Sequence, residues 1–164
     1  MAGVRSGGRP APVIDGVVLQ ALTTHADQRG FFREVCRLTD DLCRGGIGQI
    51  SHTLMVEGVI KAWHLHAIQS DYFYVPVGLL RVGLYDLREI SPTFRQSMDF
   101  LMGDGRPPAV LKIPPGVAHG CRALRGPAHL IFLNSHTYNP QDELRLPYDD
   151  PALGFDWLAE PSVA

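Results

Sequence analysis

The sequence predicts an all-β fold built from many short strands. Seventeen glycines and thirteen prolines interrupt its 164 residues so often that no segment keeps a helical period for the length of an ordinary helix. The runs between these breaks are rich in Val, Ile, Leu, Phe and Tyr, and they recur every ~8 to 12 residues, as in β-sandwiches and barrels. With 45% hydrophobic residues, the chain has material for one core of ordinary domain size.

In chain order, residues 1–10 are expected to form a flexible arm, and residues 11–164 a single domain. Each expected strand is an apolar run closed by turn residues. The expected strands are 13–20, 30–38, 49–56, 58–65, 71–77, 79–86, 96–102, 109–113, 116–124 and 129–135. Thr39 is expected to cap one short helical turn at 40–43, which Gly45 and Gly46 end. The segment after Pro147, which carries Trp157, is expected to be irregular and to wrap the outside or the mouth of the barrel.

Charge and cysteine content exclude several classes of protein. The formal net charge is -2, with 15 Lys and Arg against 17 Asp and Glu, so the chain has no basic footprint for nucleic acid. No window approaches the ~18 apolar residues of a membrane span, and the N-terminus lacks the apolar core of a signal peptide. Cys36, Cys43 and Cys121 are an odd number at wide spacings, which indicates reduced thiols in a cytoplasmic protein.

The stretch WHLHAIQSDYFYVPVG at 63–78 carries the main chemical signal. In a strand, His64 and His66 point to the same face because they are two residues apart. The spacing of glycines, histidines and Asp71 over residues 58–78 fits the first motif of the cupin barrel, with Asp in place of the usual Glu. PPGVAHG, which contains His119, resembles the second cupin motif. Together the two motifs predict a cupin double-stranded β-helix, or jelly roll.

A closer resemblance covers nearly the whole chain from Asp27 onward. The stretches DQRGFFREV, GVIKAWHLH, YDLREISPTF, LKIPPGVAHG and YDDPALGFDW resemble the dTDP-4-dehydrorhamnose 3,5-epimerase family. The resemblance implies an isomerase of deoxysugar biosynthesis that needs no cofactor. Its substrate would be a nucleotide-linked 4-keto-6-deoxy sugar, dTDP-linked in this family, which reacts through an enolate. The resemblance also implies a homodimer that exchanges an N-terminal strand.

The same resemblance assigns catalytic roles. His64 falls at the position of the base, Asp150 at that of the aspartate that orients the base, and His119 near the keto oxygen. The family's enolate-stabilising lysine falls on Asp71, and its tyrosine acid falls on Phe132. Both replacements oppose the standard mechanism, because one reverses a charge and the other removes a proton donor.

Substrate-binding positions follow from the resemblance as well. Arg29 and Lys61 would meet the diphosphate, while Phe32, Glu34 and Gln49 fall where the family holds the nucleotide base. Tyr138 is a candidate pocket residue and a possible replacement for the missing acid, or it has a structural role.

Two other functions are open at this point. His64, His66, Asp71 and His119 offer three imidazoles and one carboxylate, a set suited to Zn, Fe, Mn or Ni in a metal-dependent cupin enzyme. A divalent ion would polarise the ketone as the lysine does in the family, but a metal-bound His64 could not also be the base. The other alternative is a non-catalytic protein that binds a sugar nucleotide.

Overall fold

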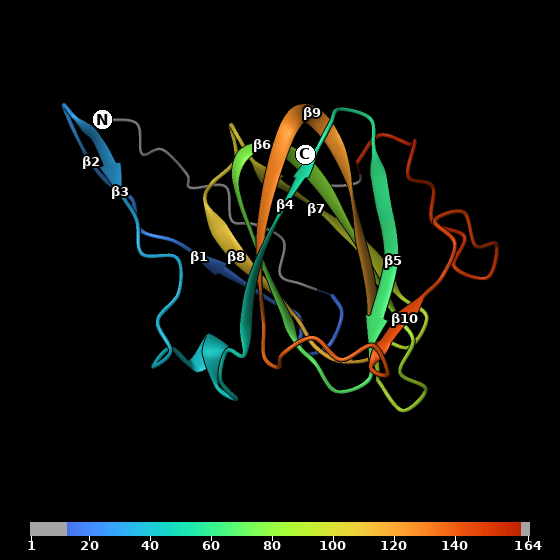
Figure 1. Cartoon of the computed structure of the whole chain (residues 1–164). Helices are drawn as coiled ribbons and strands as arrows, with labels where there is room; N and C mark the ends of the chain where they lie inside the picture. Colours follow the sequence, from blue (N-terminus) through green and yellow to red (C-terminus); the bar gives the residue numbers. More distant parts are fainter. Residues whose placement is uncertain (1–12, 162–164) are drawn as a thin grey trace, which may run out of the picture.

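The computed structural model describes residues 13–161 and shows antiparallel strands that curl into a jelly roll (Figure 1). The eight strands of the main sheet are β1 (Val18–Ala21), β4 (Gln49–Met55), β5 (Ile60–His66), β6 (Asp71–Asp86), β7 (Ser97–Gly103), β8 (Ala109–Ile113), β9 (Val117–Asn134) and β10 (Glu143–Arg145). The strands β2 (His25–Asp27) and β3 (Gly30–Phe32) form a separate hairpin, and η1 (Asp41–Cys43) is a single 3-10 turn. The all-β jelly-roll prediction is confirmed.

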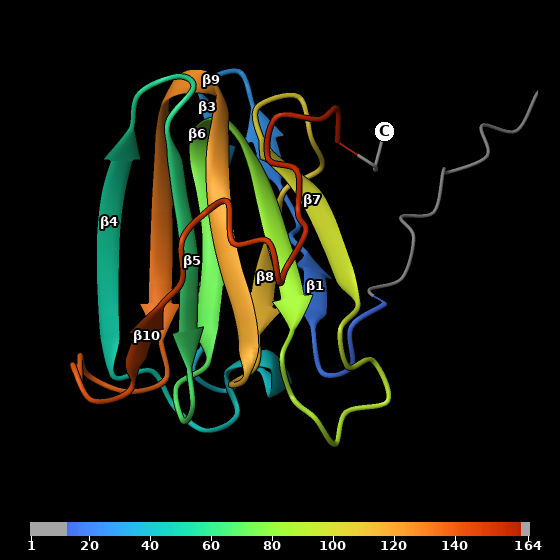
Figure 2. The same ribbon diagram turned by 90° about the vertical axis from the view of Figure 1, so that its right-hand side faces the viewer.

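Two long strands, β6 and β9, hold the barrel together by pairing along most of their length (Figure 2). The first half of β6 pairs with β8, and its second half pairs with β7. The last part of β9 pairs with β4, whereas its first part pairs with β5. Gly78 lies at the register shifts in the middle of β6, with a φ of 79° that a glycine adopts without strain. The bend there lets one strand serve both parts of the sheet.

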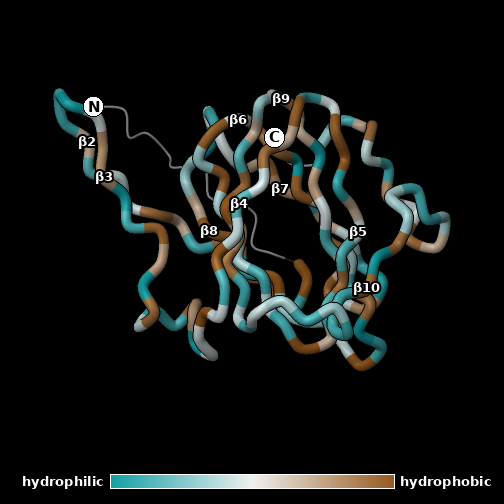
Figure 3. Tube along the Cα trace, viewed as in Figure 1, coloured by the Kyte–Doolittle hydropathy of each residue, from teal (hydrophilic) through white to brown (hydrophobic). Residues whose placement is uncertain are grey.

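The interior of the barrel is divided between an apolar core and a polar pocket. The strands carry both hydrophobic and hydrophilic residues (Figure 3), and on β4 burial alternates from one residue to the next, as expected where one face of a sheet is buried. On β5 this alternation turns Trp63 outward, where its ring packs against Phe155 and Trp157 at centroid distances of 5.1 and 4.8 Å. The C-terminal segment therefore lies on the outside of the barrel, as predicted, and the neighbouring His64 faces inward.

Several boundaries differ from the predicted ones. The expected strands 71–77 and 79–86 are one strand, β6, and 116–124 and 129–135 are one strand, β9. The strand expected at 30–38 stops at Phe32, and β2 and β10 were not predicted. Asp40 rather than Thr39 lies at the N-cap position of the helical turn, and its side chain makes no capping hydrogen bond. The N-terminal arm expected at 1–10 lies outside the described residues.

The cysteine prediction is wrong for one pair. Cys36, just after the β2–β3 hairpin, forms a disulfide with Cys43 of η1, and only Cys121 is free among the cysteines of the chain, all of which are described. The turn of η1 brings the two cysteines together, and their spacing in the sequence does not reveal this pairing. Within residues 13–161, no helix has the length and apolar character needed to cross a membrane.

Candidate active site

A pocket of about 310 Å³ opens on the inner face of the barrel between β4, β5, β6, β9 and β10. Its wall combines imidazoles, carboxylates, amides and one lysine with a few apolar side chains. The lining residues used below are Gln49, Ser51, Thr53, Lys61, His64, His66, Gln69, Asp71, His119, Phe132, Asn134, Tyr138, Glu143 and Arg145. Apolar walls with a few converging polar groups are typical of small-molecule sites.

A histidine and a glutamate form the first polar pair of the pocket. β10 pairs antiparallel with β5 and sets Arg145 opposite His64, so the side chain of Glu143 reaches His64 diagonally. The distance from His64 Nδ1 to Glu143 Oε1 is 3.1 Å. Glu143 is mostly buried, while the His64 side chain is 34% exposed and faces the pocket. A carboxylate in this position fixes the tautomer of a histidine and stabilises its protonated form.

Electrostatics keep this pair in the forms that acid–base chemistry needs. Burial would raise the pKa of Glu143, but hydrogen bonds from Arg145 and His64 hold it below its usual value, so the carboxylate is ionised. Burial, followed by the charge of His119, lowers the pKa of His64, and the Glu143 hydrogen bond opposes that change. A neutral imidazole with a free Nε2 is a competent proton acceptor.

Asp150 does not occupy the place that the resemblance implies. Its Oδ1 accepts a hydrogen bond from the backbone N–H of Ala152 at 2.9 Å, and its own N–H donates to the carbonyl of Pro147. Its carboxylate therefore stabilises the turn that follows β10. The carboxylate at the Nδ1 of His64 belongs to Glu143, and the assignment of the orienting role to Asp150 is corrected accordingly.

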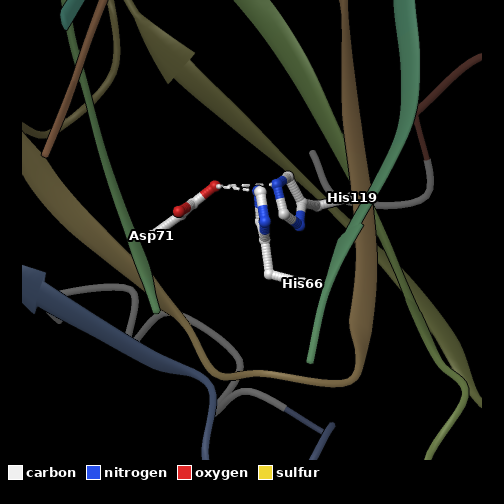
Figure 4. A group of neighbouring side chains, drawn as sticks. All are labelled: His66, Asp71 and His119. Atoms are coloured by element: carbon white, nitrogen blue, oxygen red, sulfur yellow. Dashed lines mark ion pairs between the residues drawn. The ribbon is translucent and has the colours of Figure 1, made fainter. Parts of the chain in front are cut away.

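A second cluster lies deeper in the pocket, where His66, Asp71 and His119 point toward one another (Figure 4). His119 Nε2 is 2.9 Å and His66 Nε2 is 3.7 Å from Asp71 Oδ2. The amides of Gln69 and Asn134 each donate to Asp71 Oδ1 at 2.8 Å. Burial would raise the pKa of Asp71, yet the hydrogen bond and charge of His119 hold it below its usual value. The cluster therefore contains a buried carboxylate ion.

The pocket wall carries further predicted residues. Lys61 Nζ donates to Thr53 Oγ1 at 2.6 Å, and its ammonium is the one lysine charge among the lining residues. Gln49 donates through Nε2 to Ser51 Oγ and accepts from the backbone N–H of Tyr138, both at 2.9 Å. The structure thus brings Lys61, Gln49 and Tyr138 to the same pocket as His64. Phe132 lies in the pocket wall and offers no proton there.

Three residues that were predicted to contact the substrate do not reach the pocket of their own chain. Arg29, Phe32 and Glu34 belong to or follow the β2–β3 hairpin, which projects away from the barrel (Figure 1). The Arg29 side chain is 83% exposed and pairs with Asp27, while Phe32 is largely exposed and Glu34 pairs with Arg37. None of the three lines the pocket.

Sequence reasoning did not find Glu143, Gln69, Asn134 or Asp142. Asp142 accepts hydrogen bonds from three successive backbone N–H groups, those of Ala67, Ile68 and Gln69, at 2.9 to 3.0 Å. The run QDELR gives no sequence signal for these contacts. Its strand is three residues long and joins β5 across 79 positions in sequence.

A jelly-roll barrel with a pocket lined by imidazoles and carboxylates defines the chain as a cupin-type enzyme for small molecules. Residues 12–164 match the sequence profile of the dTDP-4-dehydrorhamnose 3,5-epimerase family, and the chain belongs to this family. It is therefore an epimerase-like isomerase of nucleotide-sugar metabolism, as the sequence predicted.

Named relatives agree with this placement. The spore coat polysaccharide biosynthesis protein SpsL of Bacillus subtilis is 43% identical, and the match covers 90% of this chain and 99% of SpsL. The probable low-salt glycan biosynthesis epimerase Agl13 of Haloferax volcanii is 36% identical, over 91% of this chain and 97% of Agl13. The crystal structure of the 3,5-epimerase RmlC of Legionella pneumophila with dTDP-4-keto-L-rhamnose has a TM-score of 0.83 and 26% identity, covering 96% of this chain and 86% of that one.

Proposed function

We propose that the chain epimerises a dTDP-linked 4-keto-6-deoxy sugar through an enolate. The observation that carries the proposal is the His64–Glu143 pair, which presents an imidazole to a pocket large enough for a sugar ring. His64 Nε2 takes the proton from the carbon next to the ketone, and Glu143 stabilises the imidazolium that forms. The dTDP-sugar in the related Legionella structure supports the choice of substrate class.

Return of a proton to the other face of the enolate completes the inversion. The family resemblance implies that a tyrosine returns this proton, and Phe132 stands at the position of that tyrosine here. Among the lining residues Tyr138 is the one phenol, and its backbone is held by Gln49. We assign Tyr138 as the pocket contact for the sugar and as the available proton donor for that face. His119, deeper in the pocket, is assigned to the region of the keto oxygen.

The diphosphate is assigned to Lys61, whose ammonium is the one lysine charge among the lining residues of the pocket. Arg29, Phe32 and Glu34 complete the nucleotide site only if a second copy of the chain contributes its β2–β3 hairpin. The large exposure of Phe32 and of Phe31 beside it supports such a contact, because exposed aromatic side chains gain by burial. The protein is therefore proposed to act as a homodimer.

Isotope exchange tests the reaction. The protein is incubated with a dTDP-4-keto-6-deoxy sugar in heavy water, and deuterium at C3 and C5 is followed by NMR. The expected result is exchange at one or both carbons, faster than in a protein-free control. Tight binding of the nucleotide sugar without exchange at either carbon would overturn the enzyme proposal and leave a binding protein for this ligand.

Mixing two inactive variants tests the dimer. His64→Asn removes the base from the pocket, and Phe32→Ala removes the hairpin side chain. If each pocket uses the partner's hairpin, a mixed dimer contains one pocket with both native residues, so exchange returns when the two variants are unfolded and refolded together. Persistent inactivity of a mixture shown to contain mixed dimers would contradict the shared site.

A further inference from the structure

We propose that His66, Asp71 and His119 bind one divalent metal ion while His64 stays outside the coordination shell as the free base. The site stands on the geometry alone, whereas its role in the reaction rests on the proposed function. The three residues come from β5, β6 and β9. One candidate ligand atom from each lies within 4.8 Å of the other two, and all three side chains are largely buried.

The side of each residue that faces away from the cluster is already held. His119 Nδ1 donates to the carbonyl oxygen of Val117 at 3.1 Å, which directs Nε2 into the cluster. The amides of Gln69 and Asn134 both bind Asp71 Oδ1 and leave Oδ2 directed at the histidines. Such outer contacts commonly orient the ligands of metal ions in proteins.

For the third ligand, His66, the residue that could hold its outward side is Asp142. The Nδ1 of His66 is buried and makes no hydrogen bond, although Asp142 Oδ2 lies 3.8 Å away. Three backbone N–H groups fix the Asp142 carboxylate in that place. A metal ion at Nε2 would make the Nδ1 hydrogen a stronger donor and would favour a shorter contact with Asp142 than the present 3.8 Å.

His64 is not part of this set. Its Nδ1 contacts Glu143, and the residues whose candidate ligand atoms lie within 4.8 Å of one another are His66, Asp71 and His119. The sequence placed the metal site and the base in competition for His64, but the structure separates them. Two imidazoles and one carboxylate suit Zn, Fe, Mn or Ni and leave positions open for substrate oxygens. The bound ion would supply the positive charge beside the keto oxygen that Asp71 cannot supply.

Metal binding is tested on untagged, full-length protein that has been stripped with a chelator and dialysed separately against Zn²⁺, Mn²⁺, Ni²⁺ and, without oxygen, Fe²⁺. Metal content is measured by mass spectrometry, and affinity by competition with a chromophoric chelator. We expect one ion per chain for at least one metal. Loss of an outer contact already costs ~10 to 100-fold in affinity, so His66→Gln and Asp71→Asn are expected to lose more than that.

Two further variants serve as controls. His64→Asn should keep the wild-type affinity, and so should His52→Gln, which alters a histidine paired with His129 outside this pocket. Thermal melting of the metal-free variants identifies any that fail to fold, and His66→Gln and Asp71→Asn each test the site without the other. Substoichiometric binding of all four metals by wild type would overturn the proposal. Loss of binding in His64→Asn equal to that in His66→Gln would overturn the separation of base and metal.

The two proposals can fail independently. Metal binding without isotope exchange leaves the metal site standing and contradicts the epimerase. Isotope exchange by fully stripped protein at the rate of the reconstituted protein leaves the epimerase standing and overturns the role of the ion in it.

Discussion

Replacing Glu143 by Gln tests the orientation of the base with little change in shape. The glutamine keeps an oxygen that can accept from His64 Nδ1, where the glutamate oxygen lies at 3.1 Å, and removes only the negative charge. The protonated His64 formed in the reaction then loses its counter-ion. We expect slower exchange at saturating substrate, with little change in KM, because the lost interaction strengthens only as the proton moves.

The size of the effect follows from the position of the pair. Opposite unit charges ~4 Å apart attract by about 1 kcal/mol in water and by about 4 kcal/mol near a protein surface. His64 is 34% exposed and Arg145 shares the Glu143 carboxylate, so screening places the effect between these limits. An intermediate value of ~2 to 3 kcal/mol corresponds to a rate reduced about 30 to 150-fold.

The assay is deuterium exchange into a dTDP-4-keto-6-deoxy sugar, measured by NMR over a range of substrate concentrations. Glu143→Asp, which keeps the charge, should recover part of the rate. Asp150→Asn is the matched comparison, because Asn can still accept from the Ala152 N–H and preserve the turn. It should slow exchange by less than ~3-fold on the same Coulomb argument. A larger loss in Asp150→Asn than in Glu143→Gln would refute the assignment of Glu143.

Two other variants test separate parts of the structure. Lys61→Met should raise KM for the nucleotide sugar ~10 to 100-fold, as expected when a charge-assisted hydrogen bond is lost, and Lys61→Arg should restore binding. An unchanged KM in Lys61→Met would rule Lys61 out as a phosphate contact. Asp86 is buried, which would raise its pKa, but its hydrogen bonds with Arg88, Ser91 and Thr93 outweigh this effect and lower the pKa. The stability that the ionised Asp86 contributes is therefore complete above the unfolded pKa of ~3.9, and it is lost as the pH falls toward the folded pKa. Asp86→Asn should therefore lower the free energy of unfolding by ~3 kcal/mol at pH 7, with the difference from wild type shrinking below pH ~4. Denaturant titrations at both pH values measure this, the exposed Asp149→Asn serves as control, and a pH-independent difference would contradict the charge-based explanation.

The sequence predicted an all-β fold because the glycines and prolines that end each run also exclude long helices, and it predicted the jelly roll from the two cupin motifs. It also predicted that His64, His66, Asp71 and His119 meet, since two motifs at fixed spacing set all four on the inner face of the barrel. Strand lengths were less predictable. Gly78 reads as a break between strands, but it adopts its positive φ inside β6 and bends that strand instead.

Contacts between distant segments were beyond local reasoning. Glu143 meets His64 because a strand of three residues pairs with β5, and so short a strand has no periodicity to detect. Asp150 was assigned through a matching motif, whereas its carboxylate satisfies a backbone N–H in its own turn. The Cys36–Cys43 pairing joins residues only 7 positions apart, but it depends on the turn of η1.

The central claim, that His64 is the base of an enolate-forming epimerase, is tested most directly by one comparison. Wild type and His64→Asn are incubated with a dTDP-4-keto-6-deoxy sugar in heavy water, and deuterium at C3 and C5 is counted by NMR. Wild type should exchange at one or both carbons. The variant should bind the substrate but exchange ~100 to 10,000-fold more slowly, the usual cost of losing a proton-transfer group. Equal exchange by the two proteins, or none by wild type with the sugar bound, would contradict the account.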